Sequence, residues 1–186
     1  MKKHTLTIFV AVALLGQKHA WAGQYLGFDL CKPATPEAVK KIMEDAGASS
    51  VEIKDDPDLL TVSVRAKDYP VADGRYEVSA LLTKGKIYEV YIDKAANLMD
   101  LVVSKYGNPV IRNYSEAFST GKKWIFNDKK DREINIVYIS ADWLPPLSGF
   151  RSTLSYSCKS LEAARIAAVD KMRADERKRN STGKPL

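Results

Sequence analysis

The spacing of apolar residues in this chain switches from a helical period to a period of two, and this switch constrains the fold more than any other feature. Residues 35–37 supply an N-capping threonine, a proline for the first turn and an acid, and apolar residues recur at helical spacing up to residue 46. From residue 51 to residue 92, apolar and polar residues alternate in runs that are separated by short turns such as residues 84–86. A short helix followed by antiparallel strands is therefore predicted.

The same order returns in the second half of the chain. A second helix is predicted at residues 94–106, with Asp93 as its N-cap and Gly107 after its last residue. Further strands and a last helix follow, at residues 123–126, 133–140, 150–157 and about 161–179. Because hairpins rather than crossover helices join the strands, the fold class is α+β, with a mostly antiparallel sheet, two short packed helices and a C-terminal helix. The repeated order also allows a duplicated unit of one helix and four strands.

The first 22 residues have the pattern of a secretory signal peptide. Two lysines precede an apolar run at residues 6–15, and residues 20–22 read A-W-A, a cleavage site of the A-x-A type. The run is shorter than the roughly 20 apolar residues of a membrane-spanning helix, so no transmembrane segment is expected in the mature chain. We expect a periplasmic or secreted protein, with residues 1–22 as the signal peptide, residues 23–158 as a single α+β domain and residues 159–186 as a basic C-terminal helix and tail.

The chain has two cysteines, Cys31 and Cys158, which bracket nearly all of the predicted domain. An even number of cysteines in an exported protein favours a structural disulfide. The C-x-x-C motif that is typical of redox enzymes is absent from the sequence. A disulfide between Cys31 and Cys158 is therefore expected.

Histidine chemistry is excluded from the mature protein. The two histidines, His4 and His19, both lie in the predicted signal peptide. Their removal leaves no histidine general base, no Ser-His-Asp or Cys-His nucleophile and no histidine-ligated metal. With the cysteines bonded to each other, thiolate metal sites are excluded as well. The sequence favours a protein without catalytic residues, metal or cofactor, while carboxylate and Ser-Lys chemistry stay open.

Two groups of acidic residues are the candidates for carboxylate chemistry. They are Asp55, Asp56 and Asp58 in the first group, and Asp128, Asp131 and Glu133 in the second. A glycoside hydrolase needs two carboxyl groups held about 5 to 10 Å apart. Both groups lie at predicted turns, where aspartate side chains cap the backbone, so turn formation is the favoured interpretation. Residues 119–122 match an S-x-x-K motif in letters but are expected in a loop.

The most distinctive non-catalytic segment is an apolar loop between two predicted strands. It consists of Trp143, Leu144, Pro145, Pro146 and Leu147. Adjacent prolines stiffen the backbone, and aromatic anchors are favoured in protein interfaces. This loop is the candidate binding site. The alternative interpretation is that Trp143 folds back onto the sheet and fills the core.

The C-terminal tail carries much of the positive charge of the chain. Acidic residues interrupt its basic run at Asp175 and Glu176, and no aromatic residue is interleaved for stacking on nucleic-acid bases. A solvated terminus is favoured over a surface for anionic lipids or acidic proteins. No nucleic-acid partner is expected.

Two segments resemble small exported bacterial domains of the β-lactamase-inhibitor-protein and outer-membrane-assembly small-lipoprotein type. They are residues 35–37, which lead into a short helix, and residues 101–109, which read L-V-V-S-K-Y-G-N-P before further strands. The likeness in layout covers residues 35–157, and the chain departs from the lipoprotein members because it lacks a lipobox. The resemblance implies short helices packed against an antiparallel sheet, in a protein that works by binding other proteins.

These observations favour a non-catalytic protein-binding module with a protein partner in the cell envelope, either an inhibitor or an envelope assembly factor. Two alternatives stay open: a histidine-free carboxylate hydrolase that acts on cell-wall or other glycans, and a component of a transfer or secretion apparatus. The identity of the partner and the oligomeric state do not follow from the sequence.

Overall fold

The computed structural model describes residues 26–116, 119–127, 131–143 and 149–181. Its helices and strands follow in chain order: α1 (Pro36–Asp45), β1 (Ser50–Asp56), the 3-10 helix η1 (Pro57–Leu59), β2 (Thr61–Val71), β3 (Gly74–Thr83), β4 (Lys86–Asp93), the 3-10 helix η2 (Ala96–Leu98), α2 (Met99–Tyr106), β5 (Val110–Glu116), β6 (Ser119–Asn127), β7 (Ile134–Trp143), β8 (Gly149–Cys158) and α3 (Lys159–Ser181). The predicted α+β class is confirmed.

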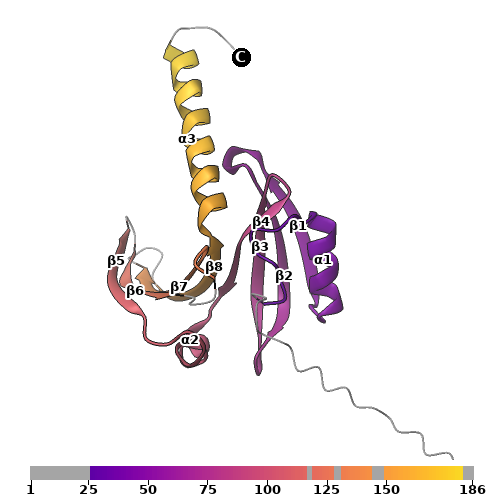
Figure 1. Ribbon diagram of the computed structural model, residues 1–186, viewed down its shortest axis with the longest axis vertical. Coiled ribbons are helices and arrows are strands. Elements are labelled where there is room, and N and C mark those ends of the chain that lie inside the picture. The colour runs from indigo at the N-terminus through magenta and orange to yellow at the C-terminus, as the bar shows by residue number, and fades with distance from the viewer. Residues whose placement is uncertain (1–25, 117–118, 128–130, 144–148, 182–186) are drawn as a thin grey trace, which may run out of the picture.

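The eight strands form one antiparallel sheet in the order β1-β2-β3-β4-β8-β7-β6-β5. Consecutive strands are neighbours from β1 to β4 and from β5 to β8, whereas η2 and α2 connect β4 to β5. The pairing of β4 with β8 joins the two halves of the sheet. Helix α1 lies beside β1 and β2, whereas α2 lies against the β5 to β8 part of the sheet (Figure 1). The order of one helix and four strands occurs twice, but element order alone is no evidence of duplication, so the duplicated unit stays a prediction.

One hydrophobic core joins both short helices to one face of the sheet. Val39 and Met43 of α1 and Val102 of α2 are buried in it. The strands contribute a cross-strand row of buried or half-buried apolar residues, Ala66, Val78, Ile92, Leu154, Tyr138 and Trp124. Alternate residues of a strand point to opposite faces, so the residues between these point away from the two short helices. The result is a covered face and an opposite face.

The start of α1 follows the sequence prediction. The Thr35 hydroxyl accepts a hydrogen bond from the Ala38 amide at 3.2 Å, and Pro36 occupies the first helical position. The second helix differs from the prediction at its start. Asp93 is the last residue of β4 rather than an N-cap, because its carboxylate binds Arg151 of β8 at 2.7 Å. The 3-10 helix η2 (Ala96–Leu98) lies between the end of β4 and the start of α2 at Met99.

Two further differences concern the outer strands. No strand was predicted at residues 110–116, which form β5 at the edge of the sheet. Residues 119–122 were expected in a loop but belong to β6. In a strand, Ser119 and Lys122 point to opposite faces, so they cannot form a serine-lysine pair across a helical turn.

Candidate functional site

The sheet face opposite α1 and α2 is the most distinctive surface in the described part of the chain. We call it the open face. Its inner half lies on β2, β3, β4 and β8, and its outer half lies on β5, β6 and β7. One cross-strand row runs through Arg65, Ser79, Tyr91, Ser155, Val137, Ile125 and Val110, and the next row runs through Glu77, Asp93, Thr153, Ile139, Lys123 and Arg112.

The inner half of the open face is a network of paired charges. The carboxylate of Asp93 accepts hydrogen bonds from Arg151 at 2.7 Å and from the Thr153 hydroxyl at 3.4 Å. The Asp93 side chain is only 13% exposed, so it is well shielded by these partners. On the neighbouring strands, Arg65 pairs with Glu77 at 3.3 Å and donates to the Ser79 hydroxyl at 3.4 Å. Each arginine is thereby fixed to a carboxylate of the same face.

Electrostatics strengthens this network. The pKa of Arg65 is raised, first by its hydrogen bond to Tyr91 and then by the nearby charges of Tyr91, Glu77 and Asp93, against an opposing effect of burial. The pKa of Arg151 is raised first by its hydrogen bond to Asp93. Both groups were charged in any case, so the shifts report how strongly the neighbouring acceptors stabilise the cations.

The outer half of the open face has a different composition. Ile125, Val137 and Ile139 are half-buried there and form an apolar strip beside Lys123. In the same half, Gly121 pairs with Ala141, and a Cβ atom at Gly121 would collide with the backbone carbonyl oxygen of Ser140. The outer half therefore combines small and aliphatic side chains with Tyr114, Glu116 and the basic residues Arg112 and Lys123.

The base of α3 lies at one end of the open face. Arg165 of α3 lies over the Tyr88 ring, 4.9 Å from the centroid, and donates to the carbonyl oxygen of Leu59 at 3.2 Å. Glu89 of β4 is largely buried in this region. Its pKa is raised to about 7, first by burial and then by the charge of Glu162, while Arg165 acts in the opposite direction. Beyond Met172, each described residue of α3 is exposed, and the helix extends away from the sheet (Figure 1).

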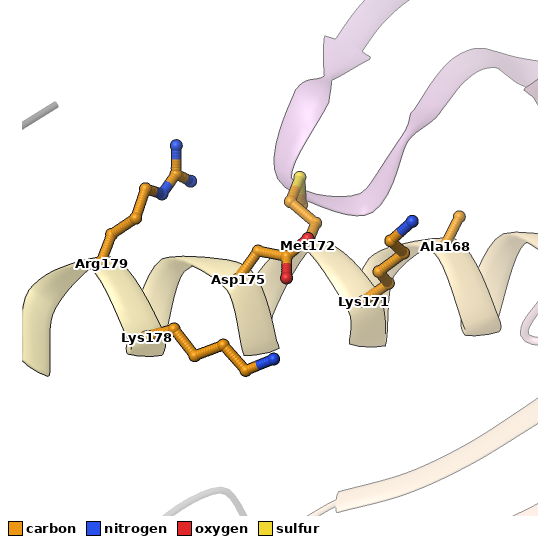
Figure 2. A pocket seen from close by; sticks show the side chains of 6 residues that line it. All are labelled: Ala168, Lys171, Met172, Asp175, Lys178 and Arg179. Atoms are coloured by element: carbon orange, nitrogen blue, oxygen red, sulfur yellow. The ribbon is translucent and has the colours of Figure 1, made fainter.

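A hollow lies beside α3. Figure 2 shows that its lining side chains project along the length of this one helix, and they are Ala168, Lys171, Met172, Asp175, Lys178 and Arg179. Side chains from a single exposed helix do not enclose a ligand from several directions, as a binding pocket requires. The hollow is an open surface of the helix.

The predicted disulfide is present. Cys31 and Cys158 are bonded, with 5.6 Å between their Cα atoms, so the segment before α1 is tied to the end of β8. Glu133 lies close to both sulfur atoms, and the three residues have the spacing of a metal site. Sulfur atoms in a disulfide are not the thiolates that bind metal ions. Glu133 instead accepts a hydrogen bond from the Ser160 amide at 2.8 Å, which caps the start of α3. The pKa of Glu133 is lowered first by the side-chain hydrogen bond with Ser160 and then by this backbone bond.

One residue of each acidic group caps a turn. The Asp56 carboxylate accepts a hydrogen bond from the Leu59 amide at 3.2 Å, and Asp131 accepts one from the Glu133 amide at 2.9 Å. Asp128 lies outside the described residues. These contacts agree with the interpretation of both groups as turn residues.

The predicted binding loop cannot be placed. Leu144, Pro145, Pro146 and Leu147 lie outside the described residues, as does the side chain of Trp143. The backbone of Trp143 pairs with Ser119 and Gly149, so the loop connects β7 to β8. Next to it, Phe150 is 61% exposed. The signal peptide also lies outside the described part of the chain.

The open face was not predicted from the sequence. The sequence did contain a signal for this face, because polar residues occupy alternate positions of the predicted strands. They are Arg65, Glu77, Tyr91 and Asp93. The alternation alone does not say which strands become neighbours. The pairing of β4 with β8 brings Arg151 to Asp93 across 58 residues of sequence.

The fold and the open face define an α+β protein with one covered and one accessible sheet face. Comparison of the chain with protein-family models, curated proteins and solved structures gives no match. Within the described ranges, no helix combines the length and apolar character needed to cross a membrane.

Proposed function

We propose that this chain is an exported, non-catalytic protein-binding module of the cell envelope, and that the open face binds the protein partner. The observation that carries the proposal is the open face itself. Its central strands hold fixed, paired charges, and an apolar strip of Ile125, Val137 and Ile139 lies beside them. A rigid surface that combines apolar side chains with ordered polar groups is typical of protein interfaces.

Three further features support the proposal. The Cys31–Cys158 disulfide fits an oxidising compartment and restrains the central strands. The signal-peptide pattern of residues 1–22 points to export. The acidic residues that were candidates for hydrolysis, Asp56 and Asp131, cap turns. An inhibitor and an envelope assembly factor both fit this description.

The test uses a charged obstruction on the open face and a matched one elsewhere. Ile139→Arg places a long cation in the middle of the outer half, whereas Ile42→Arg places the same group on the exposed side of α1, where Ile42 is 39% exposed. The mature wild-type protein and both variants, checked for folding by circular dichroism, are used to capture partners from an envelope fraction. We expect Ile139→Arg to lose a saturable partner that Ile42→Arg retains. Equal capture by both variants would show that the open face is not the binding surface.

The β7 to β8 loop is tested separately, because it is the other candidate surface. The double variant Trp143→Ala and Leu144→Ala removes both apolar side chains at the start of the loop. If the loop contributes to the interface, capture of the same partner weakens. Unchanged capture would assign binding to the open face alone.

A further inference from the structure

The outer half of the open face contains two positive charges directly opposite each other. Arg112 of β5 and Lys123 of β6 are cross-strand partners in the antiparallel register, and both point to the open face. Within the described part of the chain, neither side chain makes a hydrogen bond or an ion pair. Like charges in this position destabilise a sheet. Among the described residues, no carboxylate pairs with either cation to relieve this repulsion.

The two arginines in the inner half of the open face, unlike Arg112, each form an ion pair. Arg151 pairs with Asp93 and Arg65 pairs with Glu77, with nitrogen-to-oxygen distances of 2.7 and 3.3 Å. The inner half thus provides a carboxylate for each of these arginines. In the described outer half, Glu116 lies on the same face of β5, four residues from Arg112, but it forms no ion pair with Arg112 or Lys123. The contrast makes the outer half the positively charged end of a surface that is otherwise balanced in charge.

Apolar side chains lie beside the two cations. Ile139 is the cross-strand neighbour of Lys123, and Ile125 and Val110 lie one position along on the same face. Val110 is 53% exposed at the edge of the sheet. A ligand for this surface must therefore offer both negative charge and apolar groups. Inorganic anions supply only the first of these.

We propose that Val110, Arg112, Lys123, Ile125 and Ile139 form the docking surface for an acidic protein segment that also carries apolar side chains. This inference rests on the proposed function and specifies the chemistry of the partner. Carboxylates of the segment neutralise Arg112 and Lys123, and its apolar side chains cover the aliphatic strip. Charge complementarity of this kind mainly sets the rate of association and the choice of partner.

The test uses defined probes, because the natural partner is not identified. A random copolymer of glutamate and tyrosine supplies carboxylates and apolar groups, and a copolymer of lysine and tyrosine is the control of opposite charge. We expect the full-length mature protein to bind the first copolymer and not the second, with an affinity that falls as salt is raised. Binding to vesicles of anionic phospholipid without binding to the acidic copolymer would overturn the proposal and indicate a membrane surface.

Variants then assign the binding to these residues. The double variant Arg112→Ser and Lys123→Ser is expected to bind the glutamate copolymer at least about tenfold more weakly. The control, Lys40→Ser and Lys41→Ser on α1, removes the same charge from the other side of the sheet and should bind as the wild type does. Equal binding by the two double variants would overturn the proposal. If the Arg112 and Lys123 variant binds normally but aggregates, the cations protect the sheet edge instead.

The inference and the proposed function can fail separately. If the wild type captures a partner and the Arg112 and Lys123 variant captures it with the same affinity, the protein is a binding module but its partner is not selected by these charges. If the wild type captures no partner while the copolymer binds as expected, the surface is assigned correctly and the envelope function is wrong.

Discussion

The two halves of the open face use the same residue types in opposite ways. In the inner half, each arginine is held by a carboxylate, and Tyr91 and Thr153 add hydrogen bonds. In the outer half, Arg112 and Lys123 repel each other beside an aliphatic strip. Charges that are satisfied inside a protein stabilise its fold, whereas charges that are left without a partner are available for another molecule. The difference separates the part of the face that supports the structure from the part that fits a partner.

A covalent restraint adds to this difference. The disulfide joins the segment before α1 to the end of β8, so it lies at the inner half of the sheet. Strand β5, by contrast, lies at the edge of the sheet. The inner half is therefore the more restrained region.

Removal of the disulfide is expected to have the largest effect on stability. The two cysteines are separated by 127 residues, and a loop of that length restricts the unfolded chain enough to stabilise the fold by about 4 to 5 kcal/mol. The double variant Cys31→Ser and Cys158→Ser should lose that amount in urea unfolding, and wild type treated with a reductant is the control. A loss below about 1 kcal/mol would mean that the inner half does not depend on this restraint.

The next effect is a dependence of stability on pH that originates at Glu89. Its pKa is about 7 in the folded protein, against an ordinary value of 4.5, because burial and Glu162 disfavour the charged form. The folded state therefore binds the proton more tightly than the unfolded state. The resulting stabilisation is complete below pH 4.5 and is lost as the pH rises through about 7, by up to about 3 kcal/mol.

Glu89→Gln tests this assignment. The variant should be more stable than the wild type at pH 8, and the difference should shrink at pH 5, as measured by urea unfolding at both values. Glu52→Gln, at an exposed position of β1, is the matched control and should leave the pH dependence unchanged. If both variants keep the wild-type profile, Glu89 is not the titrating group.

The smallest effect compares the cations of the two halves directly. Arg151→Gln removes the partner of Asp93 and should cost about 1 kcal/mol, a value kept low because the arginine side chain is 51% exposed. Arg112→Gln removes one of two repelling charges and should be neutral or stabilise by a few tenths of a kcal/mol. The comparison is made by thermal unfolding at low salt. Equal losses for the two variants would remove the distinction between the halves.

Much of the fold could be predicted from sequence because it depends on local signals. Thr35 and Pro36 define the start of α1, and the short turn at residues 84–86 makes β3 and β4 neighbours. The strand β5 was missed, and its edge position leaves Val110 and Ile111 more than half exposed. An apolar residue at a sheet edge gives no clear alternation between a buried and an exposed side.

The candidate site could not be predicted in the same way. The sequence identified residues 143–147 as a binding loop from their composition, and that loop stays a prediction. The open face depends on contacts between strands that are far apart in the chain, such as Arg151 with Asp93. Composition reveals an unusual segment, but it does not reveal which ordinary residues become neighbours.

The sequence by itself determined the α+β class, the start of α1 and the pairing of two cysteines that had no other partner. Each of these follows from local spacing or from the number of cysteines. Only the tertiary structure decided that β8 lies between β4 and β7, and hence which arginines meet carboxylates and which do not. The physical reason is that the pairing of non-consecutive strands is set by burial of the whole sheet against α1 and α2, and no single segment carries that information.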